Sequence, residues 1–220
     1  MVIKENILQM KAFIYTGGSV YPENITEHPK SDDLCIAADV GYLNAKRLGD
    51  TPDIIVGDFD SGELSKIKAE FPKADITSVP AEKDFTDTEL AVNTAIKKGA
   101  EDIVIIGGLD GRLDHTLANL SIIENLSKIR IYALITNGKN RVRYIESTST
   151  LIPKSHFKYL SLIPRTPKTK GITILGCKYP LKNASLAQES QGLGISNEIT
   201  ENCAFISIKK GGLLIIESSD

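Results

Sequence analysis

The stretch Asp53-Ile54-Ile55-Val56-Gly57-Asp58-Phe59-Asp60-Ser61 runs from a short apolar segment straight into a pair of acids. An apolar run of this length without alternation is typical of a strand buried on both faces, as in a parallel sheet. Residues 63–71 then predict a helix, which Pro72 ends. Phe59 is expected to point away from its two acidic neighbours, toward the core. A buried strand followed by a helix is the repeating unit of an α/β fold.

The same alternation of strands and helices continues through the first half of the chain. The apolar runs that predict strands are residues 12–15, 34–38, 53–56, 76–79, 103–106 and 131–135. The segments that predict helices are residues 42–48, 63–71, 87–98 and 114–128. This alternation favours an open, mainly parallel sheet with helices on both faces.

The pattern changes after residue 136. Strand-like runs now follow one another without helices between them, at residues 142–145, 150–152, 159–163, 172–175, 204–208 and 213–216. Turn signals such as Asn137-Gly138 and Gly211-Gly212 separate them. These runs predict a small antiparallel β domain, either a sandwich or a barrel. We therefore expect an α/β domain over residues 1–140 and a β domain over residues 141–220.

Composition and charge exclude several classes of function. The 220 residues carry a formal net charge of -2, which gives no electrostatic reason to bind nucleic acid or an anionic membrane surface. The longest apolar runs are strand-sized, and residues 1–9 lack the hydrophobic core of a secretion signal. The three cysteines have no metal-ligand spacing. We expect a cytoplasmic protein with reduced thiols and no membrane or nucleic-acid partner.

Aspartates gather where the predicted parallel strands end. They are Asp39, Asp58, Asp60, Asp84, Asp87, Asp110 and Asp114. Because the carboxyl ends of parallel strands meet at one edge of a sheet, we expect these acids to share a site there. So many carboxylates would repel one another without a counter-charge, and Mg²⁺ bound together with phosphate would supply it. Asp is also common at helix N-caps, so capping is an alternative role for Asp114.

Two basic residues near these acids are candidates to meet phosphate. Arg112 follows a glycine-rich segment and Lys83 precedes Asp84, although solvated surface is the alternative for each. Several other signatures are absent from the sequence: the Gly-x-x-x-x-Gly-Lys-Ser/Thr loop, a Gly-x-Gly-x-x-Gly after a strand, histidines at zinc spacing and a Gly-x-Ser-x-Gly elbow. Metal-assisted phosphoryl chemistry is therefore the best-supported class.

Seven short motifs, taken together, resemble those of the thiamine pyrophosphokinase family. They are Ala38-Asp39-x-Gly41, Pro52-Asp53-x-Ile55-x-Gly57-Asp58-Phe59-Asp60-Ser61, Asp84-x-Thr86-Asp87-x-Glu89-x-Ala91, Gly107-Gly108-x-x-Gly111-Arg112-x-Asp114-His115, Ser161-Leu162-Ile163-Pro164, Gly176-x-Lys178-Tyr179-Pro180-Leu181 and Ser196-Asn197-Glu198. Each motif alone is weakly specific, but all of them in the family's order are strongly specific. Val40 stands where the family usually has glycine, and a positive φ there would strain a β-branched residue.

The resemblance implies a β-sandwich after the α/β domain, and a homodimer with its active sites at the subunit interface. It also implies transfer of the pyrophosphoryl group of ATP-Mg²⁺ to the hydroxyl of thiamine, with AMP leaving. By this resemblance, the metal ligands are Asp58, Asp60 and Asp87, with Asp84 as a second choice. Asp39 and Lys83 lie near the nucleotide, Arg112 binds phosphate oxygens, and Asp114 accepts the hydroxyl proton. Ser196 and Asn197 of the neighbouring subunit contact thiamine.

Two rival functions remain open at this point. Asp58-Phe59-Asp60-Ser61 after a strand superficially resembles the nucleophile loop of haloacid-dehalogenase-like phosphatases, but the β-rich second half has no place in that family. The other rival is a non-catalytic nucleotide- or thiamine-binding regulator on the same fold. Loss of several aspartates would be its signature, and this chain keeps them.

Overall fold

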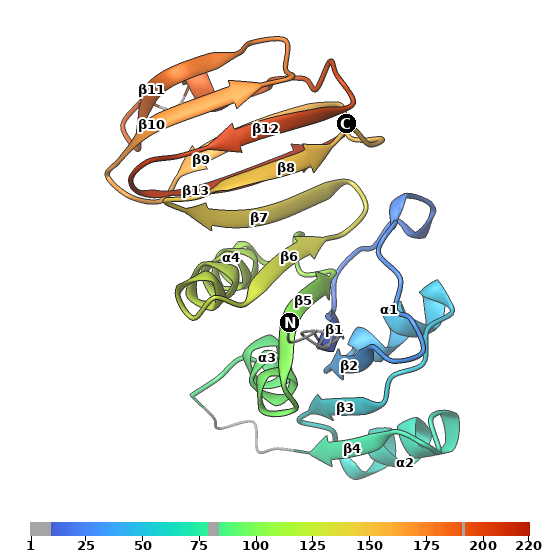
Figure 1. The fold of residues 1–220 in the computed structure, drawn as a ribbon. Coiled ribbons are helices and arrows are strands. Elements are labelled where there is room, and N and C mark those ends of the chain that lie inside the picture. The colour runs from blue at the N-terminus through green and yellow to red at the C-terminus, as the bar shows by residue number, and fades with distance from the viewer. Residues whose placement is uncertain (1–9, 79–83, 191) are drawn as a thin grey trace, which may run out of the picture.

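The computed structural model describes residues 10–78, 84–190 and 192–220. These residues form two β-sheets (Figure 1). The larger sheet has nine strands in the order β4-β3-β2-β1-β5-β6-β7-β13-β9, and the smaller one has four in the order β11-β10-β12-β8. The expected mainly parallel sheet with helices, followed by an antiparallel β-sandwich, is confirmed.

The parallel part of the larger sheet comes from the apolar runs of the first half. Its strands are β1 (Met10–Tyr15), β2 (Leu34–Ala38), β3 (Ile54–Gly57), β4 (Asp75–Ser78), β5 (Ala100–Ile106) and β6 (Tyr132–Thr136). The predicted strands lie at these places, with ends shifted by a few residues. The strands that neighbour one another in the middle of the sheet are buried on both faces, which is why they lack alternation.

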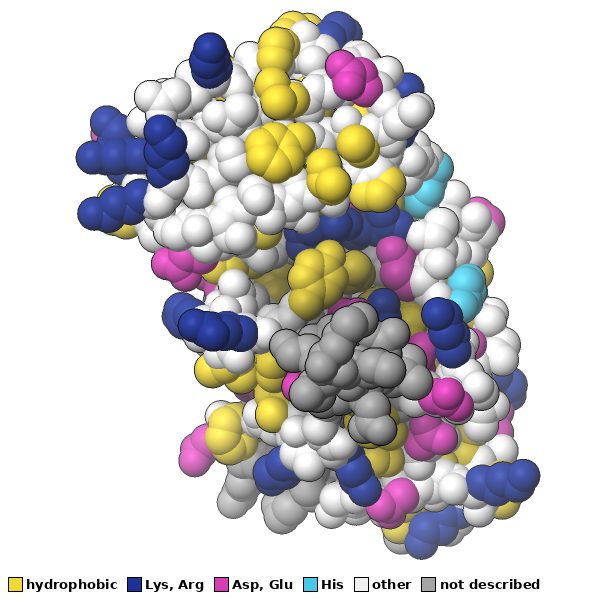
Figure 2. All heavy atoms as spheres, in the orientation of Figure 1, with side chains coloured by type: hydrophobic (Ala, Val, Ile, Leu, Met, Phe, Trp, Pro, Cys, Tyr) yellow, Lys and Arg dark blue, Asp and Glu magenta, His cyan; other side chains and the backbone are white. Residues whose placement is uncertain are grey.

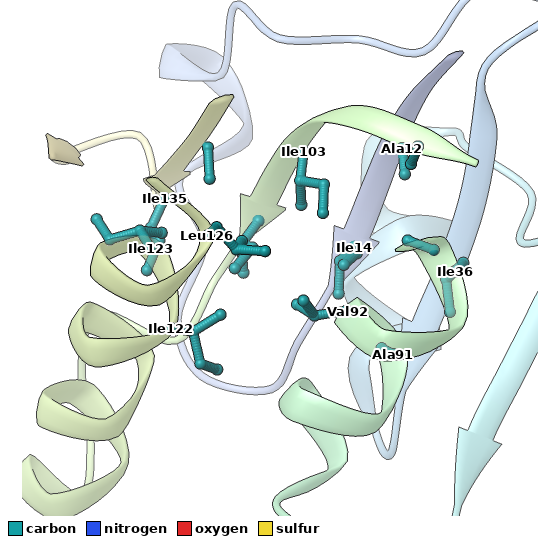
Figure 3. Close-up of a cluster of buried hydrophobic side chains, with 14 of the residues drawn as sticks. Ala12, Ile14, Ile36, Ala91, Val92, Ile103, Ile122, Ile123, Leu126 and Ile135 are labelled. Carbon is teal, nitrogen blue, oxygen red and sulfur yellow. The ribbon is translucent and has the colours of Figure 1, made fainter. Parts of the chain in front are cut away.

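Helices cover both faces of this parallel sheet. The helices α1 (Gly41–Leu48) and α2 (Ser61–Glu70) pack through Ala45 and Ile67 against one face. The helices α3 (Asp87–Lys97) and α4 (Leu113–Lys128) pack against the other face. Figure 3 shows their apolar side chains, among them Val92 and Ile122, directed at Ile14 and Ile103 of the sheet. Burial of these side chains holds the layers together.

The strand order places a switch point between β1 and β5. The chain builds outward from β1 through β2, β3 and β4, and then returns to the other side of β1 with β5 and β6. The helices change from one face of the sheet to the other at the same point. In open α/β sheets, the loops at the carboxyl ends of the strands separate here and leave a crevice.

The second half forms the sandwich. Beyond β6, the larger sheet continues with the antiparallel strands β7 (Asn140–Glu146), β13 (Gly212–Ser218) and β9 (Tyr159–Pro164). The smaller sheet contains β8 (Ser149–Pro153), β10 (Lys168–Leu175), β11 (Leu181–Ala187) and β12 (Cys203–Ser207). Apolar side chains such as Ile152, Leu162 and Ile215 fill the space between the two sheets. The sequence did not predict β11, an edge strand in which only Leu186 is buried.

The described cysteines Cys35, Cys177 and Cys203 are free thiols. Within the described residues, every helix is too short or too polar to cross a lipid bilayer.

Candidate active site

A cleft of about 340 Å³ opens at the carboxyl ends of β1, β2 and β5, at the switch point of the sheet. Loops after three strands and the first turns of two helices build it. Its lining residues are Thr16, Gly17, Gly18, Ala38, Asp39, Thr86, Asp87, Thr88, Gly108, Asp110, Gly111, Arg112, His115 and Asn119. The predicted site residues Asp39, Asp87 and Arg112 therefore share one cleft, as their strand-end positions indicated.

Asp39 sits in a conformation that few residues adopt. It follows β2 with a φ of 51°, in the left-handed region, and is half-buried. Burial raises the pKa of its carboxyl, and the charges of Asp87 and Asp58 raise it further, while a hydrogen bond from the Val40 N–H opposes them. The acids from the ends of β2 and β3 and the start of α3 are thus close enough to repel one another.

Val40 does not carry the strain that its position suggested. Its φ is -65°, which any residue adopts, and it is the residue before α1. The positive φ falls on Asp39 instead, and Asp tolerates it better than a β-branched residue does. The replacement of the usual glycine by Val40 is therefore compatible with this loop.

The two acids after β3 have different surroundings. Phe59 packs against Gly57 and into the core, as predicted, and leaves Asp58 and Asp60 exposed on the outer side. The Oδ1 atom of Asp60 accepts hydrogen bonds from the N–H groups of Gly62, at 2.7 Å, and Glu63, at 2.8 Å. Asp60 is thus the N-cap of α2, in a capping box with Glu63.

Arg112 and Asp114 bind each other at the mouth of the cleft. Nη2 of Arg112 lies 2.6 Å from Oδ2 of Asp114, and its Nε lies 3.2 Å from Oδ1. The hydrogen bond from Arg112 lowers the pKa of the Asp114 carboxyl. Both side chains are exposed, so a phosphate group could reach the guanidinium by displacing the carboxylate.

Not every predicted residue lines the cleft. Of the described residues, Asp58, Asp60, Asp84 and Asp114 are outside its lining set, and Lys83 lies outside the described residues. In that same part of the chain, no three His, Cys, Asp or Glu side chains are already arranged to hold a metal ion. Mg²⁺ commonly takes only one or two carboxylates and completes its shell with water and phosphate oxygens, so separated acids of this kind suit it.

Ser196 and Asn197 lie in the sandwich half and outside the cleft lining. Ser196 is exposed and has a φ of 57°. The Asn197 side chain is buried, where it accepts from the Tyr179 N–H at 3.0 Å and donates to the Tyr179 carbonyl at 2.8 Å. The Asn197 side chain therefore holds its segment against the backbone of Tyr179, and one subunit does not bring Ser196 and Asn197 to the cleft.

The sequence did not predict the first loop of the cleft. Thr16, Gly17 and Gly18 follow β1 and line the cleft without any charged side chain. It also missed His115 and Asn119 of α4 as lining residues. Two consecutive glycines, one residue after an apolar strand, were the available signal, because glycine lets a ligand approach the backbone closely.

Comparisons with known proteins give a consistent result for both halves. Residues 26–134 match the family model described as thiamin pyrophosphokinase, catalytic domain, and residues 148–213 match the one described as thiamin pyrophosphokinase, vitamin B1 binding domain. The chain is 32% identical over 199 residues to the thiamine pyrophosphokinase of Bacillus subtilis, covering 90% of this chain and 92% of that protein. It is 27% identical over 184 residues to thiamin pyrophosphokinase 1 of Caenorhabditis elegans, covering 80% and 74%.

Solved structures agree in fold over nearly the whole chain. The crystal structure of thiamine pyrophosphokinase from Bacillus subtilis superposes with a TM-score of 0.85 and 28% identity, covering 96% of this chain and 99% of that one. The enzyme from Geobacillus thermodenitrificans gives a TM-score of 0.82 and 27% identity, covering 96% and 98%.

Proposed function

The chain belongs to the thiamine pyrophosphokinase family, and we propose that its cleft between β1, β2 and β5 is where ATP and thiamine react. The reaction transfers the pyrophosphoryl group of ATP to the hydroxyl of thiamine and gives thiamine diphosphate and AMP. The observation that carries this function is the match of both family models, in order, over residues 26–134 and 148–213. The rival phosphatase and regulator readings are not favoured.

In this reaction the thiamine hydroxyl oxygen attacks the β-phosphorus of ATP. The new P–O bond forms as the bond from the β-phosphorus to the oxygen bridging it to the α-phosphorus breaks, and AMP keeps that oxygen. The hydroxyl proton passes to a base. Because negative charge spreads over the transferring group, the placement of cations and hydrogen-bond donors is the main contribution that a protein can make.

We propose Asp58, Asp60 and Asp87 as the residues that hold Mg²⁺, with Asp84 as an alternative ligand. Their donor chemistry fits, since carboxylate oxygens are the protein ligands that Mg²⁺ prefers. Burial raises the pKa of Asp39, and the charges of Asp87 and Asp58 raise it further, which supports the assignment because it places the three carboxyl groups near one another. Bound Mg²⁺ would neutralise charge on the phosphates and acids together.

For the remaining residues we propose the roles that the resemblance to the family implies. Arg112 steadies phosphate oxygens with its fork of donors once Asp114 releases it. Asp114, freed from Arg112, then accepts the proton of the thiamine hydroxyl. Asp39 borders the nucleotide or the metal, and Lys83 is proposed on phosphate.

On the thiamine side, we propose Ser196 and Asn197 acting from a second subunit. Their absence from the cleft of their own chain supports a homodimer with shared sites. Apolar side chains also gather on the face of the sandwich that Figure 2 shows. The exposed large apolar residues of this half include Leu151, Leu175, Tyr179, Leu193 and Ile195. Burial of such side chains against a second copy would stabilise a dimer.

We propose that the two halves of the chain bind different substrates. Residues 1–140 bind ATP and Mg²⁺ and residues 141–220 bind thiamine, as the descriptions of the two matching family models support. The free thiols fit a reducing compartment, and we propose the cytoplasm.

The test is to incubate the protein with ATP, thiamine and varied divalent metal, and to identify the products. AMP and thiamine diphosphate in equal amounts, formed only with metal present, are expected. Inorganic phosphate as the only product would favour a phosphatase. Thiamine binding in a calorimeter without any turnover would favour a regulator.

A further inference from the structure

The loop after β1 forms one wall of the cleft without using a charged side chain. Thr16, Gly17 and Gly18 line the cleft, and Gly18 has a φ of 92°. Glycine loses more conformational freedom than other residues when it becomes ordered, so this loop needs specific partners to hold one shape.

Asn44 supplies part of that restraint from α1. Its side chain is 8% exposed, and its Nδ2 donates to the carbonyl oxygens of Thr16, at 2.7 Å, and Gly18, at 3.0 Å. Asn is a poor helix former, so α1 itself gains nothing from it. Asn44 does not line the cleft, and both hydrogens of its amide bind the loop that does.

The loop is held from its other side by the segment that follows β5. Oδ1 of Asp110 accepts from the Ser19 N–H at 2.9 Å. The Gly108 N–H donates to the Gly17 carbonyl at 3.1 Å. The loop is therefore fixed between α1 on one face of the sheet and the β5–α4 segment on the other.

These contacts occupy the carbonyls of the loop and leave two of its donors unused. In the described part of the chain, the N–H groups of Gly17 and Gly18 have no hydrogen-bond partner. Unused backbone N–H groups beside a cleft are suited to phosphate oxygens, and they add no further negative charge to an acidic site.

We propose that Asn44 and Asp110 are positioning residues for the nucleotide. They hold the loop of residues 16–19 so that the Gly17 and Gly18 N–H groups meet the phosphates of ATP. This inference rests on the proposed function for the identity of the ligand. In this role Asp110 acts as a hydrogen-bond acceptor for the Ser19 N–H, and its negative charge is not required.

The first test compares Asn44→Ala with Asn137→Ala. Asn137 is a matched control, since its buried side chain also makes two hydrogen bonds to backbone, with Lys139 and Asn140, and lies outside the cleft lining. Binding of α,β-methylene ATP, which cannot be cleaved at the reacting bond, is measured by calorimetry. We expect binding about tenfold or more weaker in Asn44→Ala, the effect of losing about 1.4 kcal/mol, and within about twofold of the parent in Asn137→Ala.

The kinetic readout separates positioning from a general loss of stability. In Asn44→Ala, the KM for ATP should rise and kcat fall, while the KM for thiamine stays unchanged. Hydrogen–deuterium exchange should rise at residues 16–19 and remain as in the parent elsewhere in the sheet. Equal effects of Asn44→Ala and Asn137→Ala on nucleotide binding would overturn the proposal.

Asp110 gives a second test that does not disturb the core. Asp110→Asn keeps an Oδ1 acceptor for the Ser19 N–H, and Asp110→Ala removes it. We expect Asp110→Asn to retain nucleotide binding and Asp110→Ala to lose most of it. If both variants lose binding, the charge of Asp110 matters rather than its hydrogen bond, and if both retain binding, the hydrogen bond does not hold the loop; either result overturns the positioning role.

The results of these experiments distinguish failure of the proposed reaction from failure of the positioning role. A parent protein that forms no AMP refutes the proposed reaction, whatever the variants do. The calorimetric comparison still decides the positioning role in that case, because it requires nucleotide binding and not turnover. A parent protein that binds no nucleotide refutes both.

Discussion

Arg112 and Asp114 form a two-point ion pair, with Nη2 2.6 Å from Oδ2 and Nε 3.2 Å from Oδ1. The cation proposed for phosphate and the acid proposed for the hydroxyl proton therefore bind each other. The lowered pKa of Asp114, due to its hydrogen bond with Arg112, makes it a weaker base while the pair lasts. Binding of the ATP phosphates to Arg112 would release the Asp114 carboxylate in the same step.

Arg112→Lys tests this pair. Lysine keeps the charge but loses the fork of donors, so we expect turnover to fall about 10- to 100-fold. The pKa of Asp114, followed by NMR of carbon-labelled carboxyl groups, should rise toward the ordinary Asp value. An unchanged Asp114 titration would show that the pair is absent in solution.

Asp60→Asn should leave the fold intact and remove activity. Asn is as good an N-cap as Asp, so α2 keeps its cap and the melting temperature should stay near that of the parent. Turnover should fall on the order of 100-fold or more, since metal stabilisation contributes several kcal/mol. Asp60→Ala should in addition lose about 1 kcal/mol of stability. Near-normal turnover in Asp60→Asn would remove Asp60 from the metal site.

Asp39→Asn should make the protein more stable and less active. Because the pKa of Asp39 is raised in the folded state, the folded protein binds more protons than the unfolded one between the ordinary and the raised value. Stability therefore falls as pH rises through that window, and the charged form remains unfavourable above it. Asn removes the charge and also tolerates the positive φ.

The measurement for Asp39→Asn is the melting temperature at pH 4 and pH 8, together with turnover. The gain in melting temperature should be larger at the higher pH, and turnover should fall on the order of 10-fold or more. A variant that is less stable at both pH values would contradict the repulsion described for this site.

The thiols should differ in reactivity. Burial, and next the charge of Asp53, raises the pKa of Cys35 to about 12, and burial raises that of Cys177 to about 11. Cys203 is less buried. At about pH 8, a thiol reagent should modify Cys203 first, and Cys35 and Cys177 only on unfolding. Mass spectrometry of the labelled peptides gives the order, and rapid labelling of Cys35 in folded protein would contradict the structure.

Ser196→Ala should raise the KM for thiamine more than the KM for ATP. Mixing this variant with Asp60→Asn, after dissociation and reassociation, should restore part of the activity if each site takes residues from two subunits. Equal changes in both KM values would argue against a thiamine-side role. Absence of any restored activity in verified mixed dimers would contradict shared sites.

The sequence predicted the parallel half of the fold well because burial on both faces leaves uninterrupted apolar runs. It missed β11, whose exposed residues at the sheet edge, among them Lys182 and Asn183, carry little periodic signal. The convergence of Asp39 and Asp87 was predicted because the carboxyl ends of parallel strands meet at one edge of a sheet. The Arg112–Asp114 pair and the hydrogen bonds from Asn44 to the loop depend on side-chain geometry, and the positive φ of Asp39 is a backbone conformation. Residue spacing predicts neither.

The continuous ladder from β6 to β7 makes the two halves mechanically one body. Leu134, Ile135 and Thr136 of β6 pair with Arg143, Val142 and Arg141 of β7. Cutting the chain between the family-matched segments would expose one bare strand edge on each fragment, and such edges invite aggregation.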